Sequence, residues 1–170
     1  MWKNAYIYKD NIMIDKEGYR ENVGIVICND QRKVLWARRT GEEAWQFPQG
    51  GINNGESAEE AMYRELKEEV GLDPHNVEIL ARTKGWLKYD VPKSWIRRDC
   101  RDRYRGQKQI WFLLRFTGKD SDVFLKNTEK PEFDDWRWDS FWAPVDQIID
   151  FKKAVYEQAL KELFEYLPSA

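Results

Sequence analysis

The chain contains few of the residues that cross-link small proteins, bind zinc or act as catalytic bases. Of its 170 residues, two are cysteine and one is histidine. Cys28 lies in an apolar run and Cys100 in a basic segment, and this spacing matches neither a disulfide framework nor a zinc site. Because His75 is the single histidine and follows Pro74 in a predicted turn, we do not expect Ser-His-Asp catalysis.

Long apolar runs are also missing from the sequence. The longest, Val23 to Cys28, is interrupted by Gly24 and is far shorter than the roughly 18 residues that a membrane helix needs. Residues 1–10 lack the continuous hydrophobic stretch and the small-residue cleavage site of a secretory signal. We therefore expect a cytoplasmic protein without a membrane partner.

The chain has almost no excess of charge of either sign. Its 28 Lys and Arg nearly balance 30 Asp and Glu, which gives a net charge of -2 and no general indication of a nucleic-acid partner. Aromatic residues reach 15%, with nine Trp, although the mean hydropathy is -0.80. This content of large apolar rings predicts a compact chain, and its length predicts a single domain.

The total charge conceals two segments of opposite sign. Residues 56–69 carry six Glu against Arg64 and Lys67, whereas residues 82–108 carry ten basic residues against three acidic ones. Four Trp and Tyr residues lie among the basic ones, a pattern typical of surfaces that bind a nucleic-acid backbone. A solvated loop would show the same charge pattern, and that alternative stays open.

The hydrophobic pattern predicts a mixture of strands and helices, and therefore an α/β or α+β fold. The predicted strands cover 22–29, 33–39, 77–89, 108–117 and 136–138, and the first two form a hairpin. A helix from Ser57 to about Val70 begins with an S-x-x-E capping box, and Gly71 follows as its C-cap. Residues 151–166 have the apolar spacing of an amphipathic helix. The inward positions are Val155, Leu160, Leu163 and Phe164.

The first predicted helix carries three carboxylates on one face. Glu65, Glu68 and Glu69 stand at i, i+3 and i+4, within an arc of roughly 100 degrees. Like charges at this spacing destabilise a helix unless a cation binds between them. Oxygen ligands without His or Cys favour Mg²⁺ or Mn²⁺, and Mg²⁺ is commonly held by carboxylates together with substrate phosphates. An acidic solvated face is the alternative interpretation.

The surrounding residues favour the metal interpretation. The order is Gly50, five residues, Glu56, seven residues, Arg64-Glu65-Leu66-Lys67-Glu68-Glu69, one residue, and Gly71-Leu72. This segment resembles the Nudix box of hydrolases that act on nucleoside diphosphates linked to another group. The resemblance implies an α/β/α sandwich with a central mixed sheet, divalent-metal ligands at Glu65, Glu68 and Glu69, and an Arg64 that orients the site. Glycine at 50 and 51 lets a backbone carbonyl approach a metal.

Motifs outside the box resemble the bacterial RNA pyrophosphohydrolases, also described as dinucleoside polyphosphate hydrolases. They include Gly18-Tyr19-Arg20, Trp36-Ala37-Arg38-Arg39, Gly106-Gln107-Lys108-Gln109 and Pro131-Glu132-Phe133-Asp134. The similarity begins near Met13, so we expect residues 1–12 to be an N-terminal extension of a single domain covering 13–170. Glu21 departs from the proline that this family generally has there, which concerns the stiffness of that segment rather than catalysis.

The resemblance also implies roles for residues beyond the box. Glu132 would be a further metal ligand. The positions implied in substrate binding are Arg20, Arg39, Gln107, Gln109, Phe151 and Lys152. A Phe at the start of an amphipathic helix is more often a core residue, so Phe151 has this second interpretation.

We expect metal-dependent hydrolysis of the 5'-triphosphate of RNA to a 5'-monophosphate, the step that the resemblance links to mRNA decay. Glu69 or Glu68 would accept the proton of the attacking water, and the sequence does not choose between them. The alternatives are a hydrolase of dinucleoside polyphosphates and a noncatalytic Nudix-fold module. We expect a monomer, and no motif identifies a protein activator.

Overall fold

The computed structural model describes residues 14–169 and consists of one eight-stranded sheet with helices on both faces. The predicted extension, residues 1–12, lies outside the described part. The strands are β1 (Tyr19–Cys28), β2 (Lys33–Arg39), β3 (Trp45–Gln46), β4 (Gln49–Gly51), β5 (Val77–Arg82), β6 (Leu87–Asp90), β7 (Gly106–Phe116) and β8 (Phe133–Ser140). The α-helices are α1 (Ala58–Val70), α2 (Ala143–Gln147) and α3 (Asp150–Leu163).

The sheet is mixed because its two longest strands run parallel to each other. β1 pairs with β7 from Tyr19 opposite Gly106 to Cys28 opposite Arg115. Every other pairing in the described sheet is antiparallel, including the predicted hairpin of β1 with β2. Both faces of β1 are buried over its last seven residues, which explains why its apolar run shows no alternation.

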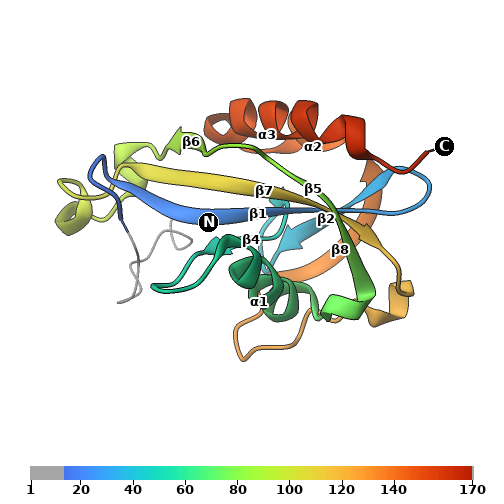
Figure 1. Cartoon of the computed structure of the whole chain (residues 1–170). Helices are drawn as coiled ribbons and strands as arrows, with labels where there is room; N and C mark the ends of the chain where they lie inside the picture. The colour runs from blue at the N-terminus through green and yellow to red at the C-terminus, as the bar shows by residue number, and fades with distance from the viewer. Residues whose placement is uncertain (1–13, 170) are drawn as a thin grey trace.

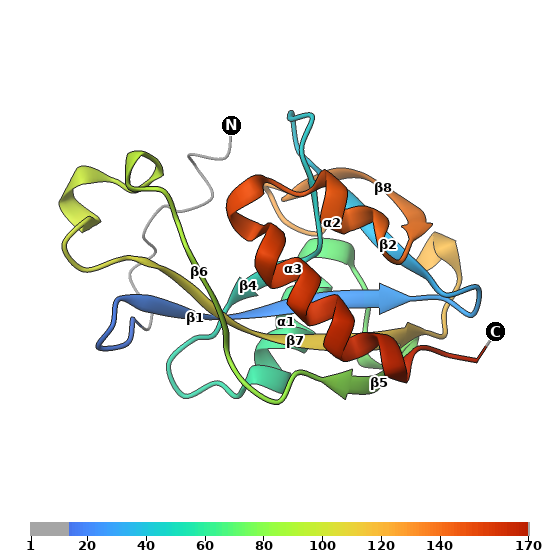
Figure 2. The same cartoon turned by 90° about the horizontal axis from the view of Figure 1, so that it is seen from above.

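The helices cover the sheet as an α/β/α sandwich, as the resemblance implied. Figure 1 shows α1 below the sheet and α2 and α3 above it, and Figure 2 shows α3 crossing the sheet diagonally. Two hydrophobic cores result. Val23, Ile25 and Ile27 point toward α1, whereas Val26 and Cys28 point toward α3. The alternation of side chains along one strand therefore supplies both cores.

The predicted carboxylate helix forms with the predicted ends. The Ser57 side chain accepts from the backbone N–H of Glu60, and the Glu60 carboxylate accepts from that of Ser57, which completes the capping box. Gly71 closes the helix with a left-handed φ of 74°. Met62 and Leu66 are fully buried against the sheet, which places the opposite flank of the helix toward solvent.

Two predictions about elements were wrong, and one helix was missed. Residues 77–89 form two strands rather than one, because the Thr83 hydroxyl accepts from the Trp111 N–H and residues 83–86 then leave the ladder before β6 rejoins β7. The short helix α2 was not predicted. Phe164 is 41% exposed, because α3 ends at Leu163 and a 3-10 turn rotates the following residues outward.

Within residues 14–169, no helix is long and apolar enough to cross a membrane.

Candidate active site

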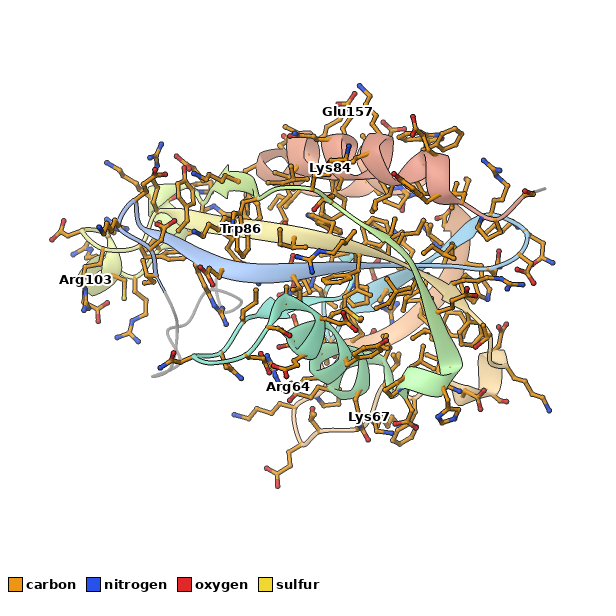
Figure 3. The ribbon with its side chains drawn as sticks, in the orientation of Figure 1. Arg64, Lys67, Lys84, Trp86, Arg103 and Glu157 are labelled. Atoms are coloured by element: carbon orange, nitrogen blue, oxygen red, sulfur yellow. The ribbon has the colours of Figure 1, made fainter. Side chains whose placement is uncertain are left out.

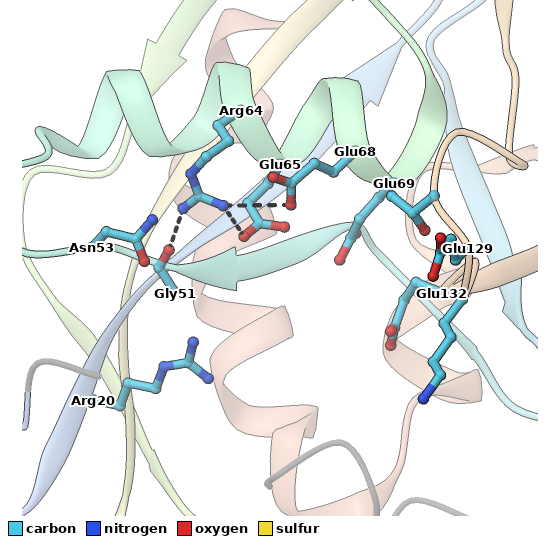
Figure 4. Close-up of a pocket in the computed structure, with 11 residues that line it drawn as sticks. Arg20, Gly51, Asn53, Arg64, Glu65, Glu68, Glu69, Glu129 and Glu132 are labelled. Atoms are coloured by element: carbon cyan, nitrogen blue, oxygen red, sulfur yellow. Dashed lines mark hydrogen bonds and ion pairs between the residues drawn. The ribbon is translucent and has the colours of Figure 1, made fainter. Parts of the chain in front are cut away.

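A polar cleft of about 590 Å³ opens along the carboxylate flank of α1. It is lined by Arg20, Gly51, Asn53, Arg64, Glu65, Glu68, Glu69, Thr128, Glu129, Lys130 and Glu132 (Figure 4). Seven of the predicted site residues thus meet in one cleft, although they come from β1, β4, α1 and the loop before β8. The loop before β8 brings Glu132, which is distant from α1 in the sequence, into the same cleft.

Arg64, on α1, forms ion pairs with three nearby glutamates. Its Nε and Nη2 donate to the two oxygens of Glu56, each at 2.8 Å, and its Nη1 donates to Glu65 at 2.7 Å. Nη1 also lies 3.5 Å from a Glu68 oxygen, and Nη2 donates to the Gly51 carbonyl at 2.7 Å. Arg64 therefore contacts two of the three clustered carboxylates and joins α1 to β4.

The two glycines of β4 allow this close packing. A Cβ atom on Gly50 would lie 1.9 Å from the carboxyl carbon of Glu65, and one on Gly51 would lie 2.0 Å from a guanidinium nitrogen of Arg20. A larger residue at either position would displace a charged side chain of the cleft. The Gly51 carbonyl, expected near a metal, already accepts from Arg64, although a carbonyl oxygen has a second lone pair.

On the opposite wall of the cleft, Glu132 is held by an ion pair with Arg39. Arg39 Nη1 donates to Glu132 Oε1 at 2.6 Å, and Arg39 Nε donates to Glu42 at 3.2 Å. Lys152, on α3, is 1% exposed and interacts electrostatically with Arg39, Glu132 and Glu69. The predicted substrate residues Arg39 and Lys152 therefore lie behind Glu132 as a buried cationic pair.

Burial opposes charge on the central carboxylates. Burial raises the pKa of Glu65 to about 7, although the neighbouring Arg64 pulls this pKa down. Burial, Glu65 and Glu132 together raise the pKa of Glu69 well above its ordinary value. On the cationic side, burial and Arg39 lower the pKa of Lys152 to about 7. These carboxylates repel one another in a half-closed cleft, and a bound cation would relieve that repulsion.

The donor set fits a hard divalent cation. Its oxygens belong to Glu65, Glu68, Glu69 and Glu132, without nitrogen or sulfur ligands. As the described side chains lie, no three of them are grouped closely enough to enclose an ion alone. This suits Mg²⁺, which is commonly held by one or two carboxylates together with water and substrate phosphates. When bound, such a cation offsets phosphate charge and lowers the pKa of water.

Gln107, Gln109 and Phe151 do not line the cleft and lie on the α3 side of the sheet. Arg20 and Gln107 are register partners on β1 and β7. Gln109 is fully buried, donates to Asn22 at 2.9 Å and accepts from the Trp111 indole at 3.2 Å, so its amide is already engaged. Phe151 packs on Tyr89 and Trp95, with ring centroids 5.9 and 5.6 Å away.

Four lining residues escaped the sequence analysis. They are Asn53, Thr128, Glu129 and Lys130. The last three lie in a polar stretch without periodicity, where no local signal separates a cleft wall from an ordinary surface loop. The proximity of Lys130 to Glu132 in the sequence was the one available indication.

The chain matches a known protein family over most of its length. The model of the NUDIX domain matches residues 18–167, and the chain therefore belongs to the NUDIX domain family. It is a Nudix pyrophosphohydrolase, an enzyme class that generally uses divalent metal ions, typically Mg²⁺.

Solved structures share the fold at low sequence identity. A Caenorhabditis elegans Ap4A hydrolase in a binary complex is 20% identical, with a TM-score of 0.63 over 86% of this chain and 97% of that one. The Escherichia coli dihydroneopterin triphosphate pyrophosphohydrolase is 21% identical, with a TM-score of 0.62 over 84% and 95%. The NUDIX domain of Shewanella oneidensis NrtR, complexed with ADP ribose, is 20% identical, with a TM-score of 0.54 over 88% and 93%.

Proposed function

We propose that this enzyme hydrolyses the 5'-triphosphate of RNA to a 5'-monophosphate, with Mg²⁺ or another divalent ion held by Glu65, Glu68, Glu69 and Glu132. The water oxygen forms a bond to a phosphorus atom, and the bond from that phosphorus to its bridging oxygen breaks. The departing group is pyrophosphate, or two phosphates in succession. The proton of the water passes to Glu69 or Glu68.

One observation carries the choice of a nucleotide end as substrate. Arg20 Nε and Gln107 Oε1 are buried, and neither has a hydrogen-bond partner within the described part of the chain. A buried polar atom without a partner costs about 1–3 kcal/mol, so such atoms are uncommon outside sites that bind a ligand. Because Arg20 also lines the cleft, a base or ribose placed beside the polyphosphate supplies the missing partners.

The basic segment favours RNA over a smaller nucleotide. Tyr89 and Tyr104, both from residues 82–108, lie close enough to Arg20 to influence its pKa. The segment therefore extends to Arg20, whose buried Nε has no hydrogen-bond partner within the described residues. Four cations of this segment form ion pairs with carboxylates of the protein. The ion pairs are Lys88 with Glu17, Arg97 with Asp99, Arg105 with Asp90 and Lys108 with Asp15. Arg82, Lys84, Lys93 and Arg98 lie outside the ion pairs formed among the described residues, and these four cations can meet phosphates.

A hydrolase of dinucleoside polyphosphates is the second candidate. The cleft presents Arg20 and Lys130 to a polyphosphate without any need for a longer strand. The C. elegans protein of the same fold is an Ap4A hydrolase, which agrees with this candidate at the level of the fold.

A competition assay tests the proposal. Wild type with Mg²⁺ receives triphosphorylated RNA and diadenosine tetraphosphate in one tube, and we expect the RNA to be consumed first. Glu69→Gln should lose at least about 100-fold in turnover, since a positioned base or ligand contributes that much. Glu59→Gln, an exposed residue of the same helix, is the matched control and should keep full activity.

Each alternative has its own outcome in this assay. Preferential loss of diadenosine tetraphosphate would select the second candidate. Turnover of neither substrate would support a noncatalytic module, and near-wild-type activity of Glu69→Gln would contradict the assigned site.

A further inference from the structure

A second groove lies beside the chain that leads from β4 into α1, here called the β4 segment (residues 49–58). It measures about 290 Å³. Its walls are Glu21, Ile52, Glu56, Ala58, Arg82, Lys84, Gly85, Trp86 and Ile110. Ile52 stands between Gly51 and Asn53, which both line the cleft, and Glu56 is the ion-pair partner of Arg64. The two hollows are therefore separated by a single thin segment of chain.

The groove has an exposed aromatic ring on its outer wall. Trp86 is 38% exposed, whereas Trp36 and Trp111 are fully buried. The Lys108 ammonium lies 4.9 Å from the centre of the Trp86 ring. Trp86 and Lys84 are labelled in Figure 3, and both belong to the connection between β5 and β6. A ring held in this way is a platform on which an unpaired base stacks.

The charges of the groove favour an anionic occupant. Of its two carboxylates, Glu56 pairs with Arg64 at 2.8 Å, and Glu21 lies 3.7 Å from Lys108, which is paired more closely with Asp15 at 2.9 Å. Arg82 and Lys84 are exposed, and neither forms an ion pair with a residue in 14–169. Arg82 instead lies over the Phe112 ring. The groove therefore presents, beside its aromatic platform, two cations that have no ion-pair partner among the described residues.

We propose that this groove binds the nucleotides of an RNA strand that follow the 5' end, with a base stacked on Trp86 and a phosphate near Lys84 and Arg82. The inference rests on the proposed function, because the strand must start in the catalytic cleft. It adds a length requirement to that function. An RNA long enough to cross the β4 segment gains contacts that a dinucleotide lacks.

The experiment compares substrates of two lengths. Wild type, Trp86→Ala, Trp86→Phe and Trp142→Ala each receive a triphosphorylated RNA dinucleotide and a triphosphorylated octanucleotide. We expect Trp86→Ala to lower kcat/KM for the octanucleotide about tenfold, the typical effect of one base stacked on an aromatic ring, and to leave the dinucleotide unchanged. Trp86→Phe should recover most of the loss. Trp142 is 42% exposed at a different place on the surface, and its variant is the matched control.

Lys84→Gln provides a second, independent readout. It should weaken the salt dependence of KM for the octanucleotide by about one ionic contact and leave that for the dinucleotide unchanged.

The outcomes separate the inference from the function on which it rests. If wild type hydrolyses both RNAs and Trp86→Ala behaves like Trp142→Ala, the groove proposal is overturned and the proposed function stands. An equal loss on both lengths would also overturn it, because Trp86 would then act on the cleft rather than on the strand. If wild type hydrolyses diadenosine tetraphosphate but neither RNA, the proposed function is contradicted. The groove proposal is then overturned as well, because it depends on RNA being the substrate.

Discussion

At the scale of single residues, Glu65 shows how the site is built at a cost in stability. It is 9% exposed, lies against Gly50 and is held by Arg64. Burial raises its pKa from 4.5 to about 7. Between these two values the folded metal-free protein binds more protons at this position than the unfolded chain does. Stability therefore falls as the pH rises through that window.

Glu65→Gln should remove this loss. Glutamine resembles the protonated acid, so at pH 8 without metal the variant should have a free energy of unfolding about 1–3 kcal/mol higher than wild type. Near pH 5 the difference should shrink, because Glu65 is then largely protonated in wild type. Urea unfolding at several pH values in the presence of a chelator measures this. A difference that does not depend on pH would contradict the explanation.

At the scale of elements, the site depends on how closely β4 approaches α1. The three residues of β4 pair with β1 through Asn22, Val23 and Gly24, and this pairing holds Gly50 beneath the Glu65 side chain. The Gln49 N–H donates to Glu69 at 3.1 Å, so the same short strand also positions a second carboxylate. Glu69 is thus oriented by a backbone N–H of β4, whereas Glu65 packs against Gly50 and is held by Arg64.

Gly50→Ala should therefore impair catalysis more than folding. The added methyl group would overlap the Glu65 carboxyl group, and a displacement of about 1 Å at a reacting site can cost up to about 100-fold in rate. We expect kcat to fall about 10- to 100-fold, with a stability loss of about 1–3 kcal/mol.

A double-mutant cycle checks the cause. If the shorter side chain of Glu65→Asp leaves room for the methyl group, Gly50→Ala should cost less in that background than in wild type. Strict additivity of the two losses would show that Gly50 acts by another route.

At the scale of the whole molecule, the two faces of the sheet support different parts of the candidate site. α1 and its core support the carboxylates, whereas α3 and its core place Lys152 behind Glu132 and Arg39. Charge is segregated in the same way, because the acidic helix and the basic segment 82–108 lie on different elements. These two regions carry net charges of -4 and +7, and the remaining residues, at -5, bring the total for the chain to -2.

A divalent metal should consequently stabilise the entire fold. Binding to the folded state alone contributes about 2.7 kcal/mol at 100 times Kd, which corresponds to a Tm increase of roughly 5–10 °C in a protein of this size. Thermal melts in chelator and in saturating Mg²⁺ measure the increase. Glu69→Gln should show a much smaller one, and Glu59→Gln the full one. An equal increase in all three proteins would place the metal elsewhere.

Much of the site follows from local sequence. The helical repeat places Glu65, Glu68 and Glu69 on one flank, and the capping box and Gly71 determine where that helix begins and ends. The apolar spacing of α3 identifies Val155, Leu160 and Leu163 as core residues. These features depend on residues within a few turns of one another, so a local pattern is sufficient to predict them.

The tertiary structure alone decided the features that join distant residues. The Arg39 to Glu132 ion pair spans 93 positions, the Arg20 and Gln107 pair depends on the parallel register of β1 and β7, and the wall formed by residues 128–130 depends on the path of a loop. The sequence by itself determined the helix, its carboxylates and the chemistry they favour. Which cations face those carboxylates was decided by sheet register and loop path, because neither leaves a periodic signal in the chain.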